Sequence, residues 1–476
     1  MAWKETDRKG IFSRPIGENE AYIKLVGDSG IPLNREHWAI NSAATIIPTG
    51  SSAPADLAAL FRNAWAHLRF QHPSIAAEVG PDGTSFTYTM PANEDALDAW
   101  VSQTFTVATD ANSSADVIPT FQPTPYAKLV YIPQSSELLL HTTHWRTDGI
   151  GILHLLDALL ALASSPSTLT TPASLPWGTE VTRLTPSIED SACIPQTPTP
   201  EQKARAAAFV DTFSHTAGAI GIPYLGDAST LPTGTRSAVL TFSPATTAKI
   251  VETCKARGIS VTAAVHASVG GANYALADPD LDSATCGRGQ EKRHYASTIR
   301  FALRPHLAEP YCAAAGAAGL YTTGWMKRVE AGMTWGKRAG EFQGEYRKGV
   351  TRDFLDAHRE YAVQLGELLR GLGKNGSKDV KGEVGPPSDV DISSIGIVEK
   401  IVKRFYGSAE AGFEVRAVSI GVEILSRQGV TFVWTFRDQL NLNVAYNEAF
   451  HSAEQMSRFV NMVKSQLLAG LDVRDD

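Results

Sequence analysis

The stretch HTTHWRTDGIG, residues 141–151, carries the strongest signal of fold and chemistry in the chain. The apolar run SELLLHT (136–142) predicts a strand that leads into it, and GIGILHLLDALLALA (149–163) predicts a helix that leaves it. His144 and Asp148 therefore lie in a loop between a strand and a helix. Loops at strand ends commonly present reactive side chains.

The chemistry of His144 suits it to act as a base. Imidazole is the side chain whose ordinary pKa lies nearest neutral pH, and a hydroxyl or amine nucleophile needs such a base to take its proton as it attacks. Asp148, four residues further on, is placed to fix the turn that aims the imidazole. Two plainer interpretations stay open: Asp148 as the N-cap of the following helix, and His144 as a packed core residue.

The segment HTTH, residues 141–144, also invites a zinc interpretation. The zinc motif HExxH needs a Glu after its first His and a helix that aligns the two rings. Thr142 stands in place of that Glu, and the segment is expected to be extended. We therefore expect no metal site here.

Composition sets the class of protein. The chain has 476 residues, of which 43% are hydrophobic, and its net charge of −7 comes from 43 basic and 50 acidic residues. The hydrophobic content excludes a wholly disordered chain. The negative net charge disfavours nucleic-acid binding, which needs clustered positive charge. Four scattered cysteines and the absence of a signal-peptide pattern favour a cytoplasmic protein. The most apolar window, 149–163, is shorter than the roughly 20 residues of a membrane span, so no membrane partner is expected.

Strands alternate with helices along the whole chain, which predicts an α/β fold. We expect an N-terminal lobe over residues 1–215 and a C-terminal lobe over residues 216–476. A Ser-, Thr- and Pro-rich stretch at about 164–201 is typical of a surface crossover between lobes.

The second half offers further elements. Helices are predicted over 260–276 and 325–371, and strands over 421–447 with a turn at Gln428–Gly429. The polar insert 371–389 begins with GLGKNG, which matches the spelling of a dinucleotide-binding loop. It follows a helix rather than a strand, so we do not expect it to bind a nucleotide.

The loop motif also carries a resemblance. His144, Asp148 and Gly149 resemble the HHxxxDG motif of the acyltransferase superfamily that includes chloramphenicol acetyltransferase, plant-type HxxxD acyltransferases and peptide-synthetase condensation domains, with Thr143 in place of the first His. The chain resembles most the fungal trichothecene 15-O-acetyltransferase branch. The segments that agree in order and character with this superfamily include FSRPIGENEAYI (12–23), AWAHLRFQHPSIAAE (64–78), CKARGISVTAAVHAS (254–268), DISSIGIVE (391–399) and FRDQLNLNVAYNEAF (436–450).

The resemblance implies a fold and a reaction. It implies two chloramphenicol-acetyltransferase-like lobes of mixed sheets and helices, with an active-site tunnel at their interface. It implies direct transfer of an acyl group, from acetyl-CoA as co-substrate, to the hydroxyl of a small hydrophobic secondary metabolite such as a trichothecene, with no permanently bound cofactor. His144 would be the general base, and Asp148 would orient it through a salt bridge to an Arg. Arg300, in STIRFALRPHL (297–307), lies where similar proteins place that Arg.

A donor to the oxyanion of the tetrahedral intermediate is also expected. Ser394, followed by Gly396 in DISSIGIVE, is the candidate, and a buried strand Ser bonded to the main chain is the plainer alternative. Two other functions stay open. One is a condensation-type or cyclising enzyme that uses a carrier-bound acyl group or none, and the other is a non-catalytic binding module on the same fold. A two-lobed monomer fits the sequence.

Overall fold

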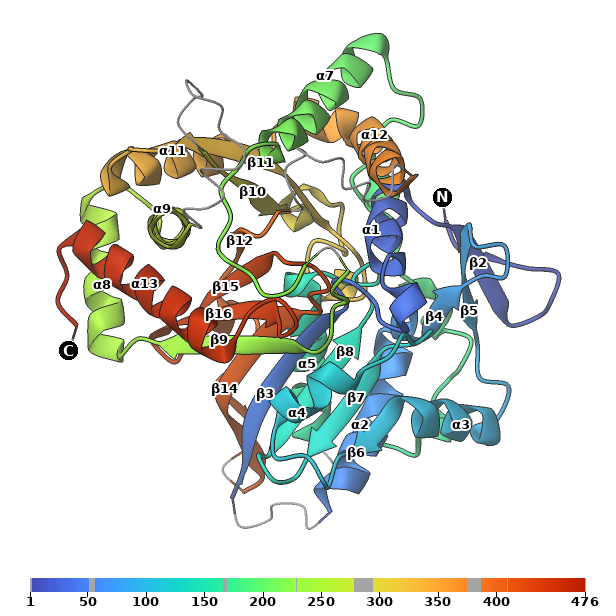
Figure 1. Cartoon of the computed structure of the whole chain (residues 1–476). Helices are drawn as coiled ribbons and strands as arrows, with labels where there is room; N and C mark the ends of the chain where they lie inside the picture. Colours follow the sequence, from blue (N-terminus) through green and yellow to red (C-terminus); the bar gives the residue numbers. More distant parts are fainter. Residues whose placement is uncertain are drawn as a thin grey trace. The chain divides into compact units, whose positions relative to one another are not determined.

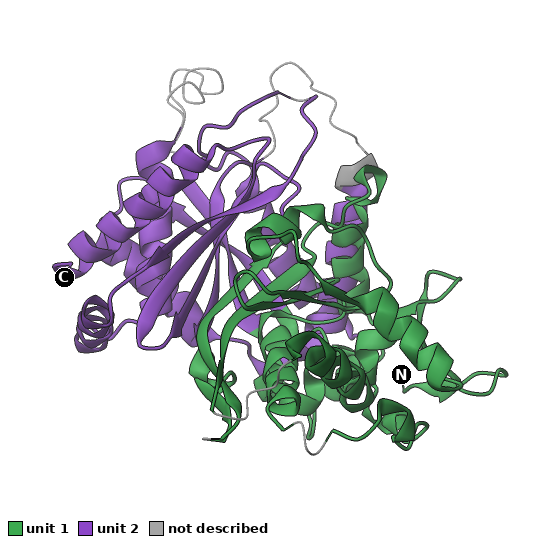
Figure 2. Cartoon of the chain, turned by 90° about the horizontal axis from the view of Figure 1, so that it is seen from below, with its two compact units in different colours: residues 1–197, 302–322, 398–423 green, residues 198–301, 323–397, 424–476 purple. Residues whose placement is uncertain are grey.

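The computed structural model describes residues 2–50, 56–165, 169–227, 229–277, 294–374, 387–408 and 410–475. The chain forms two compact units, coloured separately in Figure 2. Unit 1 comprises residues 1–197, 302–322 and 398–423, and unit 2 comprises residues 198–301, 323–397 and 424–476.

This division differs from the expected lobes 1–215 and 216–476, because two later segments return to unit 1. The reason is hydrogen bonding. Strand β14 (Gly412–Val422) pairs antiparallel with β3 (Ile40–Thr49) over nearly its whole length, so a late segment completes an early sheet.

The main sheet of unit 1 contains six strands among the described residues, in the order β13-β14-β3-β8-β7-β6. Figure 1 labels β14, β3, β8, β7 and β6 in this sheet. Its pairs are antiparallel except for β6 with β7. A smaller sheet has the order β1-β2-β5-β4. The remaining strands of unit 1 are β1 (Lys4–Glu5), β2 (Ile11–Pro15), β4 (Ala77–Val79), β5 (Ser85–Thr89), β6 (Phe105–Val107), β7 (Lys128–Ile132), β8 (Glu137–Thr142) and β13 (Phe405–Gly407).

Two apolar helices, α2 and α5, pack on each other and on the main sheet of unit 1. Asp56 caps α2 by accepting a hydrogen bond from the Ala59 amide. The predicted helix 149–163 is α5, whose buried leucines each contribute about 2 kcal/mol by leaving water. The helices of unit 1 are α1 (Glu18–Asp28), α2 (Leu57–Gln71), α3 (Glu94–Thr104), α4 (Ser114–Val117), α5 (Gly149–Ala163) and α6 (Ile188–Ser191).

Within the described residues, unit 2 contains a four-stranded sheet in the order β12-β15-β16-β9, in which β12 and β15 are parallel and the other pairs are antiparallel. Helices α8, α9, α11 and α13 pack together, and α8, α9 and α13 also pack on this sheet. Strands β10 and β11 form a separate pair. The elements are β9 (Thr235–Thr241), β10 (His294–Ala302), β11 (Thr322–Glu330), β12 (Val390–Ile397), β15 (Gly429–Phe436), β16 (Gln439–Asn447), α7 (Pro200–Asp211), α8 (Pro244–Ala256), α9 (Val261–Leu276), α11 (Trp335–Lys348), α12 (Arg352–Lys374) and α13 (Ala453–Leu471).

Two local predictions were wrong. Residues 322–330 form strand β11 rather than the start of a helix, because their backbone pairs with β10. The tight turn lies at Arg437–Asp438, where both residues have positive φ as a two-residue hairpin requires, and Gly429 instead begins β15. Of the GLGKNG segment, residues 375 and 376 lie outside the described residues. Within the described part of the chain, no helix is long and apolar enough to cross a membrane.

The start of α5 comes very close to the returning segment 302–322. A Cβ added at Gly151 would lie 2.3 Å from the Ala317 carbonyl oxygen and 2.2 Å from the Thr147 hydroxyl oxygen. Thr147 itself donates a hydrogen bond of 2.7 Å to the Ala317 carbonyl. Only glycine allows this approach of backbone to backbone.

Replacing Gly151 with Ala is therefore expected to lower the free energy of unfolding by about 1–3 kcal/mol or more, because the new methyl group overpacks a rigid contact. Gly340 in α11 is the matched control, since a Cβ there meets nothing within 4 Å. Gly340→Ala should leave stability unchanged or raise it by up to about 1 kcal/mol. Denaturant unfolding of both variants measures this, and equal effects would contradict the close-approach argument.

Candidate functional site

Arg146 holds the loop that carries His144 through side-chain hydrogen bonds. The buried guanidinium of Arg146 donates hydrogen bonds to the Thr142 and Thr143 hydroxyls within the loop. It also donates to three main-chain carbonyls outside the loop, those of Ser74 (3.2 Å), Ala77 (2.7 Å) and Pro125 (2.6 Å). Burial lowers the pKa of Arg146 to about 10. Thr143, which stands where the superfamily motif has its first His, thus helps to hold the loop in place.

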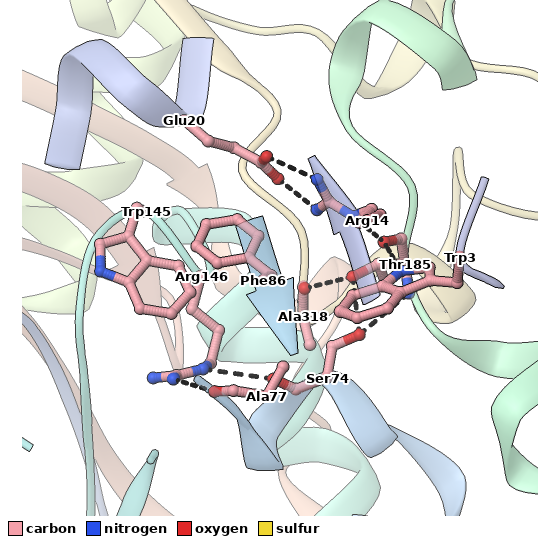
Figure 3. Close-up of a pocket in the computed structure, with 10 residues that line it drawn as sticks. All are labelled: Trp3, Arg14, Glu20, Ser74, Ala77, Phe86, Trp145, Arg146, Thr185 and Ala318. Carbon is pink, nitrogen blue, oxygen red and sulfur yellow. Dashed lines mark hydrogen bonds and ion pairs between the residues drawn. The ribbon is translucent and has the colours of Figure 1, made fainter. Parts of the chain in front are cut away.

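A second buried arginine lies beside this anchor, across a cavity of about 10 Å³, which is room for about one water molecule. Figure 3 shows the Arg14 guanidinium facing the Glu20 carboxylate, and Arg146 lying against Ser74 and Ala77. Glu20 also accepts a hydrogen bond of 2.8 Å from the amide of Gly17, the N-cap residue of α1. Arg14, in the segment 12–23, therefore contributes a buried ion pair to the packing of unit 1.

His144 itself is half-buried, and its ring forms a hydrogen bond within the loop. Its Nδ1 lies 3.0 Å from the Thr147 carbonyl oxygen. A carbonyl only accepts, so Nδ1 carries the proton in that bond. The neutral ring then has its lone pair on Nε2, which is the form a general base needs.

Asp148 is the N-cap of α5, as the plainer interpretation held, and it is also half of a buried ion pair. Its Oδ1 accepts from the amides of Ile150 (3.0 Å) and Gly151 (2.8 Å). Nη1 of Arg304 lies 2.6 Å from each carboxylate oxygen, and the Tyr321 amide donates to Oδ2 at 2.8 Å. One carboxylate therefore ties the helix start to both ends of the segment 304–321.

The ionisation of Asp148 reflects these contacts. Burial alone would raise the pKa of Asp148, but the charge and hydrogen bond of Arg304, together with the Gly151 and Tyr321 amides, outweigh burial and lower the pKa below its ordinary value. Asp148 is thus a charged, fully occupied acceptor at neutral pH.

The predicted partner of Asp148, Arg300, was wrong by four residues. Arg300 is still within strand β10, and its guanidinium donates to the Asp391 carboxylate at 2.7 Å and to the Ile392 carbonyl in unit 2. Arg304 comes after the strand has ended, in the short turn Arg304–His306, and there it reaches Asp148. An Arg does pair with Asp148, as the resemblance implies, but it is Arg304. Strand β10 ends at Ala302, so Arg300 lies within the strand and Arg304 lies beyond it.

The predicted oxyanion residues lie in unit 2, on strand β12. The Ser394 hydroxyl forms a hydrogen bond of 2.8 Å with the Thr262 hydroxyl in the first turn of α9. Gly396 is exposed, has φ +85°, and follows a bulge in the pairing of β12 with β15. Ser394 is therefore bonded to a side chain rather than to the main chain.

The other histidines of interest are packed. His141 is buried, lies 2.8 Å from the Asn41 amide oxygen and stacks on Phe121, and burial lowers its pKa to about 3. His266 is stacked on Phe342, and burial likewise lowers its pKa to about 3. Among the residues that the structure describes, no group of three or more His, Cys, Asp or Glu side chains is arranged to hold a metal ion.

Three positioning groups went unrecognised in the sequence: Arg304, Arg146 and the Tyr321 amide. Arg146 sits inside the motif itself, so its place beside His144 and Asp148 was an available signal. The Tyr321 contact uses a main-chain amide, and no side-chain pattern reports such a contact.

Replacing Arg304 with Met should lower the free energy of unfolding by about 3–5 kcal/mol, because it leaves the Asp148 carboxylate buried without an opposite charge. In a double-mutant cycle, Arg304→Met and Asp148→Asn should be strongly non-additive. Denaturant unfolding of the two single variants and the double variant measures the coupling.

Arg300 provides the matched control, because it pairs with Asp391 instead. Arg300→Met and Asp148→Asn should add to within about 0.5 kcal/mol. Coupling at positions 148 and 300, with none at 148 and 304, would contradict the observed pairing.

Known structures share this fold. Trichothecene 15-O-acetyltransferase from Fusarium sporotrichioides superposes with a TM-score of 0.78 at 18% identity, covering 98% of each chain. The first condensation domain of the calcium-dependent antibiotic synthetase superposes with a TM-score of 0.62 at 13% identity, over 97% of this chain and 96% of that one. These likenesses confirm the predicted two-lobed α/β fold class.

Sequence relatives are closer. No family model matches the chain. "O-acetyltransferase pigM" from Monascus ruber is 29% identical over 100% of this chain and 88% of its own length. "Acetyltransferase pigO" from the same organism is 40% identical over 481 residues, which cover 100% of this chain and 99% of the relative. A match of this extent places the chain in the same family: it belongs to the acetyltransferases related to pigO and is an acyltransferase.

Proposed function

We propose that the chain is an acetyl-CoA-dependent O-acetyltransferase that acts on a hydroxyl of a small hydrophobic secondary metabolite, with His144 as the general base. The observation that carries the proposal is the hydrogen bond from His144 Nδ1 to the Thr147 carbonyl, since it leaves the lone pair of the neutral ring on Nε2. Family membership supports the acetyl donor. A relative named "Azaphilone biosynthesis cluster protein M", 27% identical, supports a metabolite as acceptor.

The proposed reaction proceeds by direct transfer. His144 Nε2 takes the proton of the acceptor hydroxyl as its oxygen attacks the thioester carbonyl of acetyl-CoA. The tetrahedral intermediate then expels the CoA sulfur, which receives the same proton from Nε2. The products are an acetyl ester and free CoA, and the neutral imidazole is restored with its proton on Nδ1.

Asp148 and Arg304 act in this scheme by holding geometry. The loop bond of His144 is made to the carbonyl of Thr147, the residue next to Asp148. Any shift of Asp148 therefore moves the acceptor of that bond. A misplacement of about 1 Å can cost on the order of 100-fold in rate, so the buried ion pair serves the base without touching the substrate.

Ser394 is the proposed donor to the oxyanion. It shares one hydrogen bond with Thr262, and two hydroxyls joined by a single bond keep one further proton between them. That proton is available to a developing oxyanion. Gly396, beyond the bulge, is proposed to give the strand the shape that presents Ser394.

Replacing His144 with Ala or Gln should lower turnover by about 10²- to 10⁴-fold, because the hydroxyl then loses its base. Turnover is measured as release of the CoA thiol from acetyl-CoA, and as the mass gain of an acetyl group on polyhydroxylated terpenoid alcohols, trichothecenes included. Both variants should keep a saturable thermal shift with acetyl-CoA, which reports an intact fold and donor site. Wild-type turnover in either variant would refute the role of His144, and no shift in the wild type would favour a carrier-bound donor.

Replacing Ser394 with Ala should lower kcat by about 100-fold and leave the KM for acetyl-CoA little changed, because an oxyanion donor acts only in the transition state. Ser393 is the matched control, since adjacent strand residues point to opposite faces. Steady-state kinetics of Ser394→Ala and Ser393→Ala measure the difference. Equal effects at the two positions would refute the proposed donor.

A further inference from the structure

One bulky side chain near His144 has a backbone conformation that favours glycine. Trp38 has φ +64°, which is a genuine outlier for a large aromatic residue. Other such residues lie where chains turn: Asn34 ends a short helix, and Arg437 with Asp438 forms a hairpin turn. Strained residues of this kind gather at functional sites, where the surrounding structure holds them in place.

The backbone around Trp38 is held by the end of strand β14. The Trp38 amide donates to the Glu423 carbonyl at 2.8 Å, and the Glu423 amide donates to the Ala39 carbonyl at 2.8 Å. The Glu423 carboxylate forms an ion pair with Arg35. These contacts fix the left-handed conformation, but glycine would meet them without strain. These main-chain hydrogen bonds therefore do not explain why position 38 carries an indole side chain.

The indole bridges a buried apolar cluster and the proposed base. It packs against a cluster in unit 1 that contains Trp145 and Leu320. Trp145 in turn stacks on Phe86, with ring centroids 4.4 Å apart. Figure 3 shows the two side chains next to each other. The indole also contacts His144, with ring centroids 6.5 Å apart and planes inclined at 57°, and the neighbouring His37 ring, with centroids 5.4 Å apart. Trp38 stays half-buried, whereas Trp145 and Leu320 are buried.

We propose that Trp38 determines acceptor specificity: its indole is the wall beside His144 on which a flat, unsaturated ring skeleton of the acceptor alcohol lies. The inference rests on the proposed base role of His144. An aromatic face attracts another flat π-surface beyond simple burial. A large indole, fixed next to the base by a strained backbone, therefore favours an alcohol carried on such a skeleton over a saturated one of similar size.

The test uses the full chain with acetyl-CoA and three acceptor probes: naphthylethanol, cyclohexylethanol and ethanol. The wild type should prefer naphthylethanol over cyclohexylethanol in kcat/KM by about 2- to 10-fold. Trp38→Leu should abolish this preference mainly through a higher KM for naphthylethanol, and Trp38→Phe should retain most of it. In Trp38→Leu, the ratio of kcat/KM for naphthylethanol to kcat/KM for ethanol should also fall by about 2- to 10-fold, because ethanol carries no ring that could lie on the indole.

A second tryptophan of unit 1 serves as the control. Trp177 is half-buried, meets Phe70 edge-on at 5.3 Å and donates from Nε1 to the Pro172 carbonyl at 3.0 Å. Trp177→Leu should leave the naphthyl-to-cyclohexyl ratio at its wild-type value. If it removes the preference as Trp38→Leu does, the effect is one of general packing.

Each remaining outcome decides the question. No preference in the wild type, or an unchanged ratio in Trp38→Leu, overturns the proposal. An equal loss of transfer to ethanol and to naphthylethanol in Trp38→Leu also overturns it, because Trp38 would then act through the orientation of His144. Failure of the base role is seen separately, as wild-type transfer of the acetyl group to ethanol in His144→Ala.

Discussion

The ion pair of Asp148 and Arg304 is the constraint on which the rest of unit 1 depends. Neither charge can be left alone at this depth, because an unpaired buried charge costs several kcal/mol. The pair therefore fixes three things together: the first turn of α5, the path of segment 304–321, and the carbonyl of Thr147 that contacts His144 Nδ1. Glycine at position 151 belongs to the same arrangement, since Nη2 of Arg304 would lie 2.7 Å from any Cβ there.

Arg146 holds the His144 loop through hydrogen bonds to uncharged groups. Arg146 spends its donors on carbonyls and hydroxyls, and its cavity neighbour Arg14 is neutralised by Glu20. The His144 loop is thus held by the hydrogen bonds that Arg146 donates and, where the loop enters α5, by Asp148. Preorganisation of this kind is the main way a protein raises the efficiency of a single base.

The sequence located the reactive loop but not all of its supports. His144 and Asp148 were found because strand, loop and helix follow one another locally, and helix α5 and strand β8 formed within one or two residues of expectation. Arg300 was chosen over Arg304 because the exact end of strand β10 decides which side chain leaves the sheet, and strand ends are poorly encoded. β11 was missed because it depends on pairing with a distant strand. Trp38 had no local signal at all, and the tunnel and the oxyanion donor stay predictions.

The return of residues 398–423 to the first sheet has a consequence for any attempt to produce the N-terminal half by itself. A fragment ending near residue 215 would lack β14, so β3, ten residues long, would become a bare outer strand with unsatisfied main-chain groups. Such a strand is a template for self-association. The fragment would also bury the Asp148 carboxylate without its counter-ion. The two halves of the chain are therefore not independent folding units. Residues 398–423 are synthesised late, and they are needed to complete a sheet whose strand β3 is synthesised early.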